Sequence, residues 1–277
     1  MHWHSVKTQK ETTRMRIGMI ADWVEADIKF AADTKIPYVE FIPWCPMSEF
    51  TGKRKEVETL LDKYNVKTSA MGFFNHDIIH PDATKRASEL KDVNEMIDLC
   101  KAWHTPVFMI GAGELQKGRN EQEALRESIE ALKRIVNYAG ERGITVAVYN
   151  CHCWNYCVTP RHWGALLSAI PQIRFKYDCS HSYYDGRDYL SEIRDFGQYF
   201  AHFHVKGCVK AEGRRLDDPP AGLDQIDWRS VMALLYKCEY KGVLSLEPHS
   251  PLWTDAKRMK YQGLRFSANF IRTLQVD

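Results

Sequence analysis

Strand-like and helix-like segments alternate from one end of this chain to the other, and this alternation restricts the folds that it can adopt. Short apolar runs are each followed by a longer segment in which apolar residues recur with helical spacing. The predicted strands are residues 16–20, 38–42, 67–72, 107–110, 145–149, 175–178, 200–206 and 243–247. In one helical segment the apolar positions step by three or four residues, as on the buried face of a helix: Leu125, Ile129, Leu132, Val136 and Ala139.

Eight such strand–helix units without a low-complexity linker predict a single (β/α)8 TIM barrel. The chain has 277 residues, which is long enough for this fold, and we expect the barrel over residues 15–277. Residues 1–14 are polar, and we expect them to form a flexible N-terminal extension. A doubly wound open sheet is the alternative, but it usually has fewer units, and the first strand–helix turn (residues 21–24) lacks a glycine-rich phosphate-binding fingerprint.

The composition argues against nucleic acids and membranes as partners. The formal net charge is only +2, which gives no electrostatic reason to expect nucleic-acid binding. No apolar run approaches the length of a membrane span and no signal-peptide pattern opens the sequence, so we expect a cytoplasmic protein. Cys151, Cys153 and Cys157 lie close together, but buried or loop thiols explain them better than a soft-metal or redox site, because no second cluster completes a four-thiolate site.

Three predicted strands end on side chains that bind hard divalent cations: Asp178, His204 and Glu247. The carboxyl ends of barrel strands meet at one mouth, where the active sites of TIM-barrel enzymes lie. A buried carboxylate or imidazole is costly unless it is paired or binds a cation. We therefore predict one metal site, with Mn²⁺ favoured and Mg²⁺, Co²⁺ or Zn²⁺ as alternatives, rather than three separate hydrogen-bonded side chains.

Other polar residues follow the same strands. His202, His204 and Lys206 alternate, so they share one face of their strand, with Lys206 nearest the mouth. His202 lies deeper, and we expect it to be a hydrogen-bonded core histidine. His181 follows Asp178 in an Asp-x-x-His arrangement.

These motifs resemble those of the sugar phosphate isomerase/epimerase superfamily. That superfamily comprises the xylose-isomerase-like TIM barrels of the AP endonuclease 2 type and includes ketose 3-epimerases, inosose dehydratases and endonuclease-IV-type enzymes. The resemblance extends from about residue 16 to the last helix and depends on four motifs: Tyr38-Val-Glu40-Phe, Asp178-x-x-His181, His204-Val-Lys206 and Ser245-Leu-Glu247.

The resemblance implies that Asp178, His204 and Glu247 ligate a divalent metal. It also implies that His181 contacts metal-bound substrate or serves as a further ligand, and that the substrate is a small-molecule carbohydrate. Dimers or tetramers are common among similar barrels, so a homo-oligomer remains open.

The chain departs from the superfamily at the end of the fifth strand. Members usually carry a glutamate there, as metal ligand and often as base, whereas this sequence has Tyr149 in the run Val146-Ala-Val-Tyr149-Asn150. A phenol with a pKa near ~10 is a poor ligand unless the metal lowers that pKa. Either three residues hold the metal, or Tyr149, Asn150 or His152 supplies a fourth ligand. A smaller departure is Gly207, which follows Lys206 where members often have aspartate.

Loops after the predicted strands carry aromatic, amide and imidazole groups of the kind that bind sugars. We predict that His76, Asn150, His152, Trp154 and Trp23 contact the substrate. For the tryptophans, packing between loops is an equally good explanation. For His76, a structural role in its loop is equally good.

We expect a metal-dependent isomerase or epimerase that acts on a sugar or keto-sugar through a metal-stabilised enediolate. Glu247 would be the base, Lys206 and His181 would donate hydrogen bonds, and Tyr149 is a further catalytic candidate. Because Tyr149 replaces the usual glutamate, a lyase or dehydratase on a keto-sugar, keto-glycoside or inosose is the alternative, and a non-catalytic sugar-binding protein is a third. A DNA-repair nuclease would need additional His and Glu ligands, which are missing at the ends of the fourth and fifth strands.

Overall fold

Eight parallel strands close into a barrel in this computed structural model, which describes residues 15–276. The strand order is β1-β10-β7-β6-β5-β4-β3-β2, and β1 also pairs with β2 to complete the circle. Every strand predicted from the sequence is present to within two residues. The bounds are β1 Arg16–Ile20, β2 Tyr38–Phe41, β3 Lys67–Phe73, β4 Val107–Ile110, β5 Thr145–Tyr149, β6 Arg174–Asp178, β7 Phe200–Val205 and β10 Val243–Leu246. The single TIM barrel is confirmed, and the predicted N-terminal extension lies outside the described residues.

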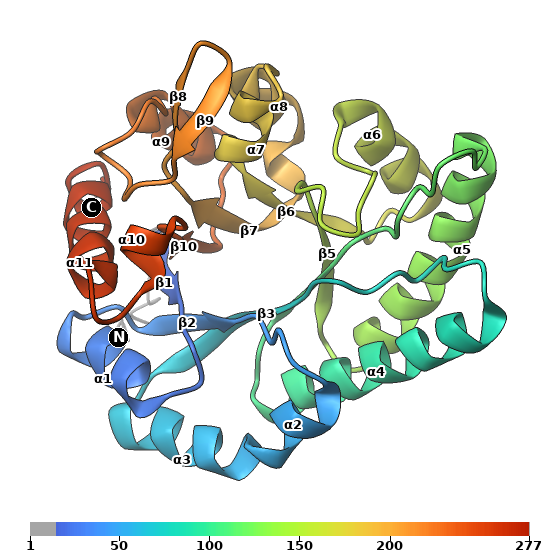
Figure 1. Ribbon diagram of the computed structural model, residues 1–277, viewed down its shortest axis with the longest axis horizontal. Coiled ribbons are helices and arrows are strands. Elements are labelled where there is room, and N and C mark those ends of the chain that lie inside the picture. Colours follow the sequence, from blue (N-terminus) through green and yellow to red (C-terminus); the bar gives the residue numbers. More distant parts are fainter. Residues whose placement is uncertain (1–14, 277) are drawn as a thin grey trace, which may run out of the picture.

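Helices surround the barrel on its outer side (Figure 1). Asp82, Asn120, Asp188 and Asp227 begin four of them by accepting hydrogen bonds from backbone N–H groups of the first turn. No helix within residues 15–276 is long and apolar enough to cross a membrane. The bounds are α1 Glu25–Asp33, α2 Met47–Gly52, α3 Arg54–Tyr64, α4 Ala83–Ala102, α5 Glu121–Gly140, α6 Pro160–Ala169, α7 Cys179–Tyr184, α8 Tyr189–Phe196, η1 Gly197–Tyr199, α9 Trp228–Lys237, α10 Pro251–Thr254 and α11 Lys260–Thr273.

Alternate residues of each strand face the helices or the barrel interior. On β5, Val146 and Val148 belong to the large core that the helices complete, whereas Ala147 and Tyr149 belong to a second, smaller cluster. On β6, the interior-facing positions include Lys176 and Asp178, which are both buried. The upper part of the barrel interior is therefore charged at β6 but not at β5. The candidate site lies on the β6 side.

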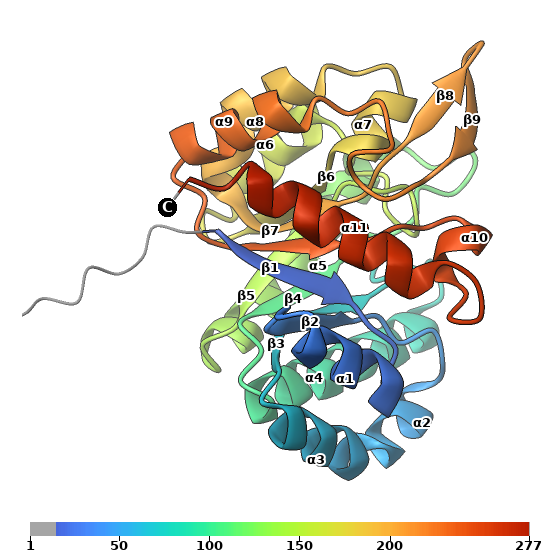
Figure 2. The same cartoon turned by 90° about the vertical axis from the view of Figure 1, so that its left-hand side faces the viewer.

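A short antiparallel hairpin, β8 (Val209–Ala211) and β9 (Arg214–Asp217), follows β7. The sequence did not predict strands there, because both are short and contain charged residues, and β9 is largely exposed. Figure 2 shows that the hairpin and α10 lie at the end of the barrel toward which the β1 arrow points. The hairpin thus forms part of the wall above the carboxyl ends of the strands.

Candidate active site

The ends of three neighbouring strands bring Asp178, His204 and Glu247 together. Asp178 is the last residue of β6, His204 is the penultimate residue of β7 and Glu247 directly follows β10. Each of these residues offers a ligand atom, and the three atoms lie within 4.8 Å of one another. Asp178 and His204 are buried and Glu247 is nearly so, which places the group at the floor of the barrel mouth.

His204 is held between two carboxylates. Its Nδ1 donates to Glu247 Oε2 at 2.6 Å, and its Nε2 donates to Glu40 Oε1 at 2.8 Å. Burial lowers the pKa of His204, but the negative charge of Glu40, with that of Glu247, outweighs burial and raises the pKa overall. Glu40 also accepts a bond from His202 Nε2 at 2.7 Å, so His202 is the hydrogen-bonded core histidine that the sequence predicted. With Nε2 fixed by Glu40, Nδ1 is the nitrogen that faces the mouth.

Asp178 is fixed through its backbone and one carboxylate oxygen. The side-chain amide of Asn150 donates to the Asp178 carbonyl at 2.9 Å and its oxygen accepts from the Asp178 N–H at 2.9 Å. Oδ1 accepts from the Ser180 N–H at 2.9 Å. The buried Oδ2 receives no well-directed hydrogen bond from the described residues, although Lys206 Nζ lies 2.9 Å away. A buried carboxylate oxygen that is short of hydrogen bonds is suited to binding a cation.

Lys206 and His181 form the next layer of the site. Lys206 Nζ donates to His181 Nε2 at 3.0 Å and lies 4.0 Å from Glu247 Oε2. Burial lowers the pKa of Lys206, but the charges of Asp178 and Glu247 raise it overall, so the amine is protonated at neutral pH. Burial and the nearby Lys206 charge hold the pKa of His181 well below its ordinary value, so His181 is a neutral imidazole.

Lys176 is a site residue that the sequence analysis missed. Its side chain is 1% exposed, and Nζ lies 3.9 Å from Asp178 Oδ2. The signal was available, because residues two apart in a strand point to the same side, so Lys176 and Asp178 had to share the barrel interior.

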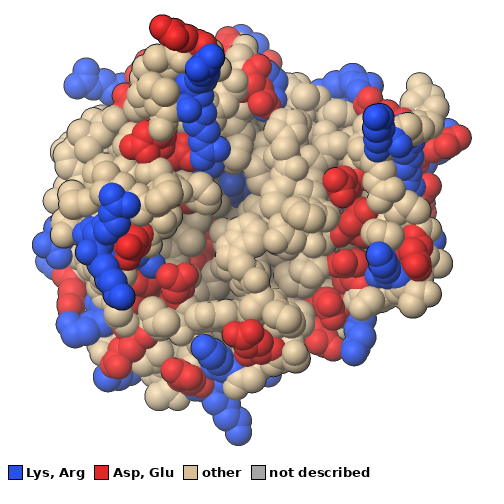
Figure 3. Space-filling view, viewed as in Figure 1, with Lys and Arg blue, Asp and Glu red and all other residues tan. Residues whose placement is uncertain are grey.

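A cavity of about 540 Å³ opens above these residues, and Lys176, Lys206, His181 and Glu247 are among those that line it. Figure 3 shows the mouth as a hollow whose walls are mostly uncharged, with charges of both signs around its rim. A second hollow of about 220 Å³ adjoins it and shares Ile42, Trp44, Glu247 and His249.

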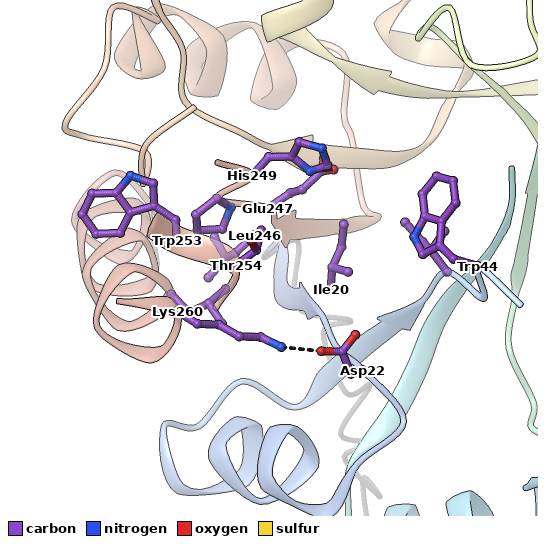
Figure 4. A pocket seen from close by; sticks show the side chains of 12 residues that line it. Ile20, Asp22, Trp44, Leu246, Glu247, His249, Trp253, Thr254 and Lys260 are labelled. Atoms are coloured by element: carbon purple, nitrogen blue, oxygen red, sulfur yellow. Dashed lines mark hydrogen bonds and ion pairs between the residues drawn. The ribbon is translucent and has the colours of Figure 1, made fainter. Parts of the chain in front are cut away.

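In Figure 4, Glu247 and His249 lie side by side, opposite Trp44, in this second hollow. His249 Nδ1 is 3.2 Å from Glu247 Oε1, close enough to help position that carboxylate. An ion pair between Lys260 and Asp22, at 2.8 Å, lies at the edge of the same hollow.

The donor set fits a divalent metal. Two carboxylates and one imidazole suit hard and borderline cations, and Glu40 orients the imidazole from its far side. A second group with ligand-like spacing is Glu40, His202 and His204. There, the Glu40 carboxylate already accepts hydrogen bonds from both histidines, and the positive charges of the histidines lower its pKa despite burial. The first group therefore fits a metal better than the second.

The family model described as xylose isomerase-like TIM barrel matches residues 28–270. The chain belongs to this family. Among curated proteins, none matches the sequence.

Several solved structures have the same fold as this chain at low sequence identity. D-Allulose 3-epimerase from Methylomonas sp. has a TM-score of 0.74 and 18% identity, with 94% of this chain and 98% of that chain covered. 3-Keto-D-glucoside 4-epimerase from E. coli has a TM-score of 0.75 and 13% identity, covering 94% and 99%. A probable 3-DHS dehydratase from Bacillus anthracis has a TM-score of 0.73 and 14% identity, covering 93% and 99%.

Tyr149, which replaces the usual glutamate, does not direct its hydroxyl at the metal ligands. The hydroxyl donates to the Cys153 carbonyl at 2.8 Å, and the ring stacks on Phe74 with centroids 4.2 Å apart. Burial raises the pKa of Tyr149 well above its ordinary value, so the phenol stays protonated. Among residues 15–276, the Tyr149 hydroxyl makes no hydrogen bond with Asp178, His204 or Glu247, and its role as ligand or base stays a prediction.

The other possible fourth ligands are also engaged elsewhere. Both ends of the Asn150 amide bond to the Asp178 backbone. His152 Nε2 lies 3.1 Å from Asp185 Oδ2, although His152 does line the main cavity. Burial raises the pKa of Cys151, which also lines the cavity, to about 11, so its thiol is protonated at neutral pH. The described residues therefore bring together three possible ligands, Asp178, His204 and Glu247.

Of the five residues predicted to bind substrate, His152 alone is among the lining residues of either hollow. His76 stacks on Phe73 and pairs with Glu89. Trp23 packs on Phe50 at a centroid distance of 4.2 Å. Trp154 is 41% exposed and adopts a left-handed backbone with φ of 46°. In place of Trp23 and Trp154, the structure presents Trp44 to the cavity.

Proposed function

We propose that this protein is a divalent-metal-dependent enzyme of the sugar isomerase/epimerase type, acting on a sugar or keto-sugar. The observation that carries this proposal is the convergence of Asp178, His204 and Glu247 on the same cavity that Lys206 and His181 line. Structural neighbours in this family are named as sugar epimerases, which supports the same class of reaction.

Asp178, His204 and Glu247 would hold the metal, for which we favour Mn²⁺ over Mg²⁺, Co²⁺ or Zn²⁺. Two carboxylates and one imidazole with open positions suit a cation that accepts mixed oxygen and nitrogen donors. When bound, such a cation acts as a Lewis acid toward a carbonyl and makes the neighbouring C–H more acidic.

Glu247 is the base in this proposal. Burial alone would raise its pKa, but Lys206 and His204 hold it well below the ordinary value, so the carboxylate is ionised and able to accept a proton. His249 Nδ1 lies 3.2 Å from Glu247 Oε1 and would help to keep that oxygen in place. Lys206, whose ammonium is 4.0 Å from Glu247 Oε2, would stabilise negative charge that develops on a substrate oxygen.

The number of bases restricts the reaction. Inversion of a carbon by two opposed bases needs a second group on the far face of the substrate, and Tyr149 does not provide one. A single base on one face suffices to move a proton between adjacent carbons, so isomerisation fits the site better than two-base epimerisation. Elimination also needs only one base and one acid, and the dehydratase among the neighbours favours a lyase as the second candidate.

Proton abstraction can be tested before the natural substrate is known. Metal-loaded protein would be incubated in D₂O with a panel of keto-sugars, and NMR would follow deuterium incorporation next to the carbonyl. Incorporation that is lost in Glu247→Gln and Asp178→Asn supports the proposal. An unsaturated keto product, detected by ultraviolet absorbance, would identify the lyase. Binding without exchange would instead support a non-catalytic sugar-binding protein.

A further inference from the structure

Lys176 carries a buried positive charge that no hydrogen bond satisfies. Among the described residues, no acceptor lies within hydrogen-bond distance of its Nζ, and the nearest carboxylate oxygen, Asp178 Oδ2, is 3.9 Å away. Lys206 lies closer to that oxygen, at 2.9 Å. The Lys176 side chain is 1% exposed, yet it lines the main cavity. The ammonium is therefore aimed into the cavity with its donors available.

Other charged side chains around this cavity have close partners. Arg215 pairs with Asp218, and Asp185 pairs with Arg187. Lys206 is bonded to His181. A buried ammonium that has only a distant ion pair and no hydrogen bond is costly, which makes Lys176 a candidate for binding a ligand.

Once a divalent metal is bound, the charged groups around the metal ligands would have a net positive charge, which favours an anion. Three carboxylates lie at the floor of the barrel mouth, those of Glu40, Asp178 and Glu247, together with the two lysines Lys176 and Lys206. With His202 and His204 counted as neutral, a divalent cation would bring the positive charge to four against these three negative charges. The replacement of a carboxylate by Tyr149 on β5, directly beside Lys176 on β6, removes the charge that would otherwise balance it.

We infer that Lys176 is a specificity-determining residue that binds a carboxylate on the substrate, so that the enzyme acts on an acidic sugar. This inference rests on the proposed function and names its substrate class. Lys176 lies below the level of Asp178 on β6, inside the barrel, where a small planar group attached directly to the sugar carbon chain would reach it. A phosphate ester is larger and would fit better at the rim, where Arg215 lies.

The test compares three sugars that differ only at one carbon: D-fructose, D-fructuronate and D-fructose 6-phosphate. Calorimetry would measure their dissociation constants with Mn²⁺-loaded wild type and with Lys176→Met, which keeps the bulk of the side chain but removes its charge. Because a charge-assisted hydrogen bond contributes about 1.5–3 kcal/mol, wild type should prefer fructuronate to fructose by roughly 10- to 100-fold. Lys176→Met should abolish that preference.

Lys210→Met is the matched control, because Lys210 Nζ already donates to the Tyr183 carbonyl at 2.7 Å. It should retain the preference for fructuronate. Thermal unfolding gives a second readout: removal of a buried charge that no hydrogen bond satisfies should leave Lys176→Met as stable as wild type or more so, whereas a purely structural lysine would make it less stable.

Each outcome decides between explanations. Equal binding of fructose and fructuronate by wild type, or a preference that survives in Lys176→Met, overturns the inference while leaving the proposed function intact. A Lys176-dependent preference for the 6-phosphate overturns the carboxylate assignment in favour of a phosphate. Failure of all three sugars to bind overturns the inference, whereas the proposed function is overturned only if the deuterium-exchange panel also shows no reaction.

Discussion

Tyr149 on β5 is in register with Lys176 on β6, and both side chains point into the barrel. Where related enzymes usually place a glutamate, this chain therefore has a neutral phenol beside a cation. The Tyr149 hydroxyl donates a hydrogen bond to the Cys153 carbonyl, while the Lys176 ammonium faces the cavity. The last residue of β5 is thus uncharged and stands beside a lysine on the neighbouring strand.

Tyr149→Phe should have little effect on function. The variant loses one hydrogen bond, to the Cys153 carbonyl, and should lose about 1 kcal/mol of unfolding free energy. Metal content and proton exchange should match wild type, because the hydroxyl touches no metal ligand. Tyr240→Phe is the control. The buried Tyr240 hydroxyl donates to the Val243 carbonyl at 2.8 Å, and this hydrogen bond lies away from the barrel mouth. A large loss of exchange in Tyr149→Phe alone would return Tyr149 to a catalytic role.

Glu40→Gln should weaken both the fold and the metal site. Glu40 accepts hydrogen bonds from His202 and His204, and breaking a buried ion pair costs about 3–5 kcal/mol. Because Glu40 orients His204, metal affinity should fall by roughly 10- to 100-fold. Glu192→Gln is the control: Glu192 is also buried and bonded, to Tyr177, Ser182 and Arg187, but it does not line the cavity. Its loss should lower stability and spare metal binding.

Ionisation of Glu40 should make the unfolding free energy of the protein depend on pH. Burial raises the pKa of Glu40, but the charges of His204 and His202 outweigh burial and hold it below its ordinary value of 4.5. The unfolded chain then binds a proton below that pH while the folded protein does not. The stabilisation is therefore present above pH 4.5 and lost as the pH falls.

Urea unfolding of metal-free protein between about pH 3 and pH 6 would measure this effect. In Glu40→Gln, the slope of unfolding free energy against pH should be shallower by up to ~1.4 kcal/mol per pH unit. An unchanged slope would mean that Glu40 is not ionised in the folded protein.

The barrel was predictable because its signals are local and repeated. Alternating strands and helices, and a polar residue at each of three strand ends, place Asp178, His204 and Glu247 at one mouth by topology alone. The side chains in loops were less predictable. His76 stacks on Phe73, and Trp23 packs on Phe50. Such contacts depend on how loops fold over the barrel rather than on the periodic spacing of apolar residues in the sequence.

Gly207, which stands where related proteins often carry aspartate, has a steric explanation. A Cβ at this position would lie 2.3 Å from the Pro219 carbonyl oxygen and 2.9 Å from Asp224 Cβ. Gly207→Ala should therefore cost about 1–3 kcal/mol of unfolding free energy, and Gly207→Asp more, since its carboxylate would also approach Asp224. Gly164→Ala, in α6 with open space around the position, should be neutral or stabilising. Equal melting temperatures for Gly207→Ala and wild type would show that the loop carrying Pro219 moves freely.

Substitution of Lys206 should affect proton transfer but should not weaken metal binding. Its ammonium lies 2.9 Å from Asp178 Oδ2, the oxygen that lacks a well-directed hydrogen bond, so it competes electrostatically with a metal. Lys206→Met should therefore bind Mn²⁺ at least as tightly as wild type, in a titration followed by calorimetry. Proton exchange should nevertheless fall by roughly 10²- to 10⁴-fold, because the variant no longer stabilises charge on the substrate oxygen.

Asp178→Asn provides the contrast to Lys206→Met, since it removes a ligand charge and should lose both metal and exchange. Weakened Mn²⁺ binding in Lys206→Met would mean that Lys206 holds Asp178 in position instead of competing for it. That result would make the lysine part of the scaffold of the metal site, and the charge on the substrate oxygen would then have to be met by His181, the remaining polar side chain bonded to Lys206.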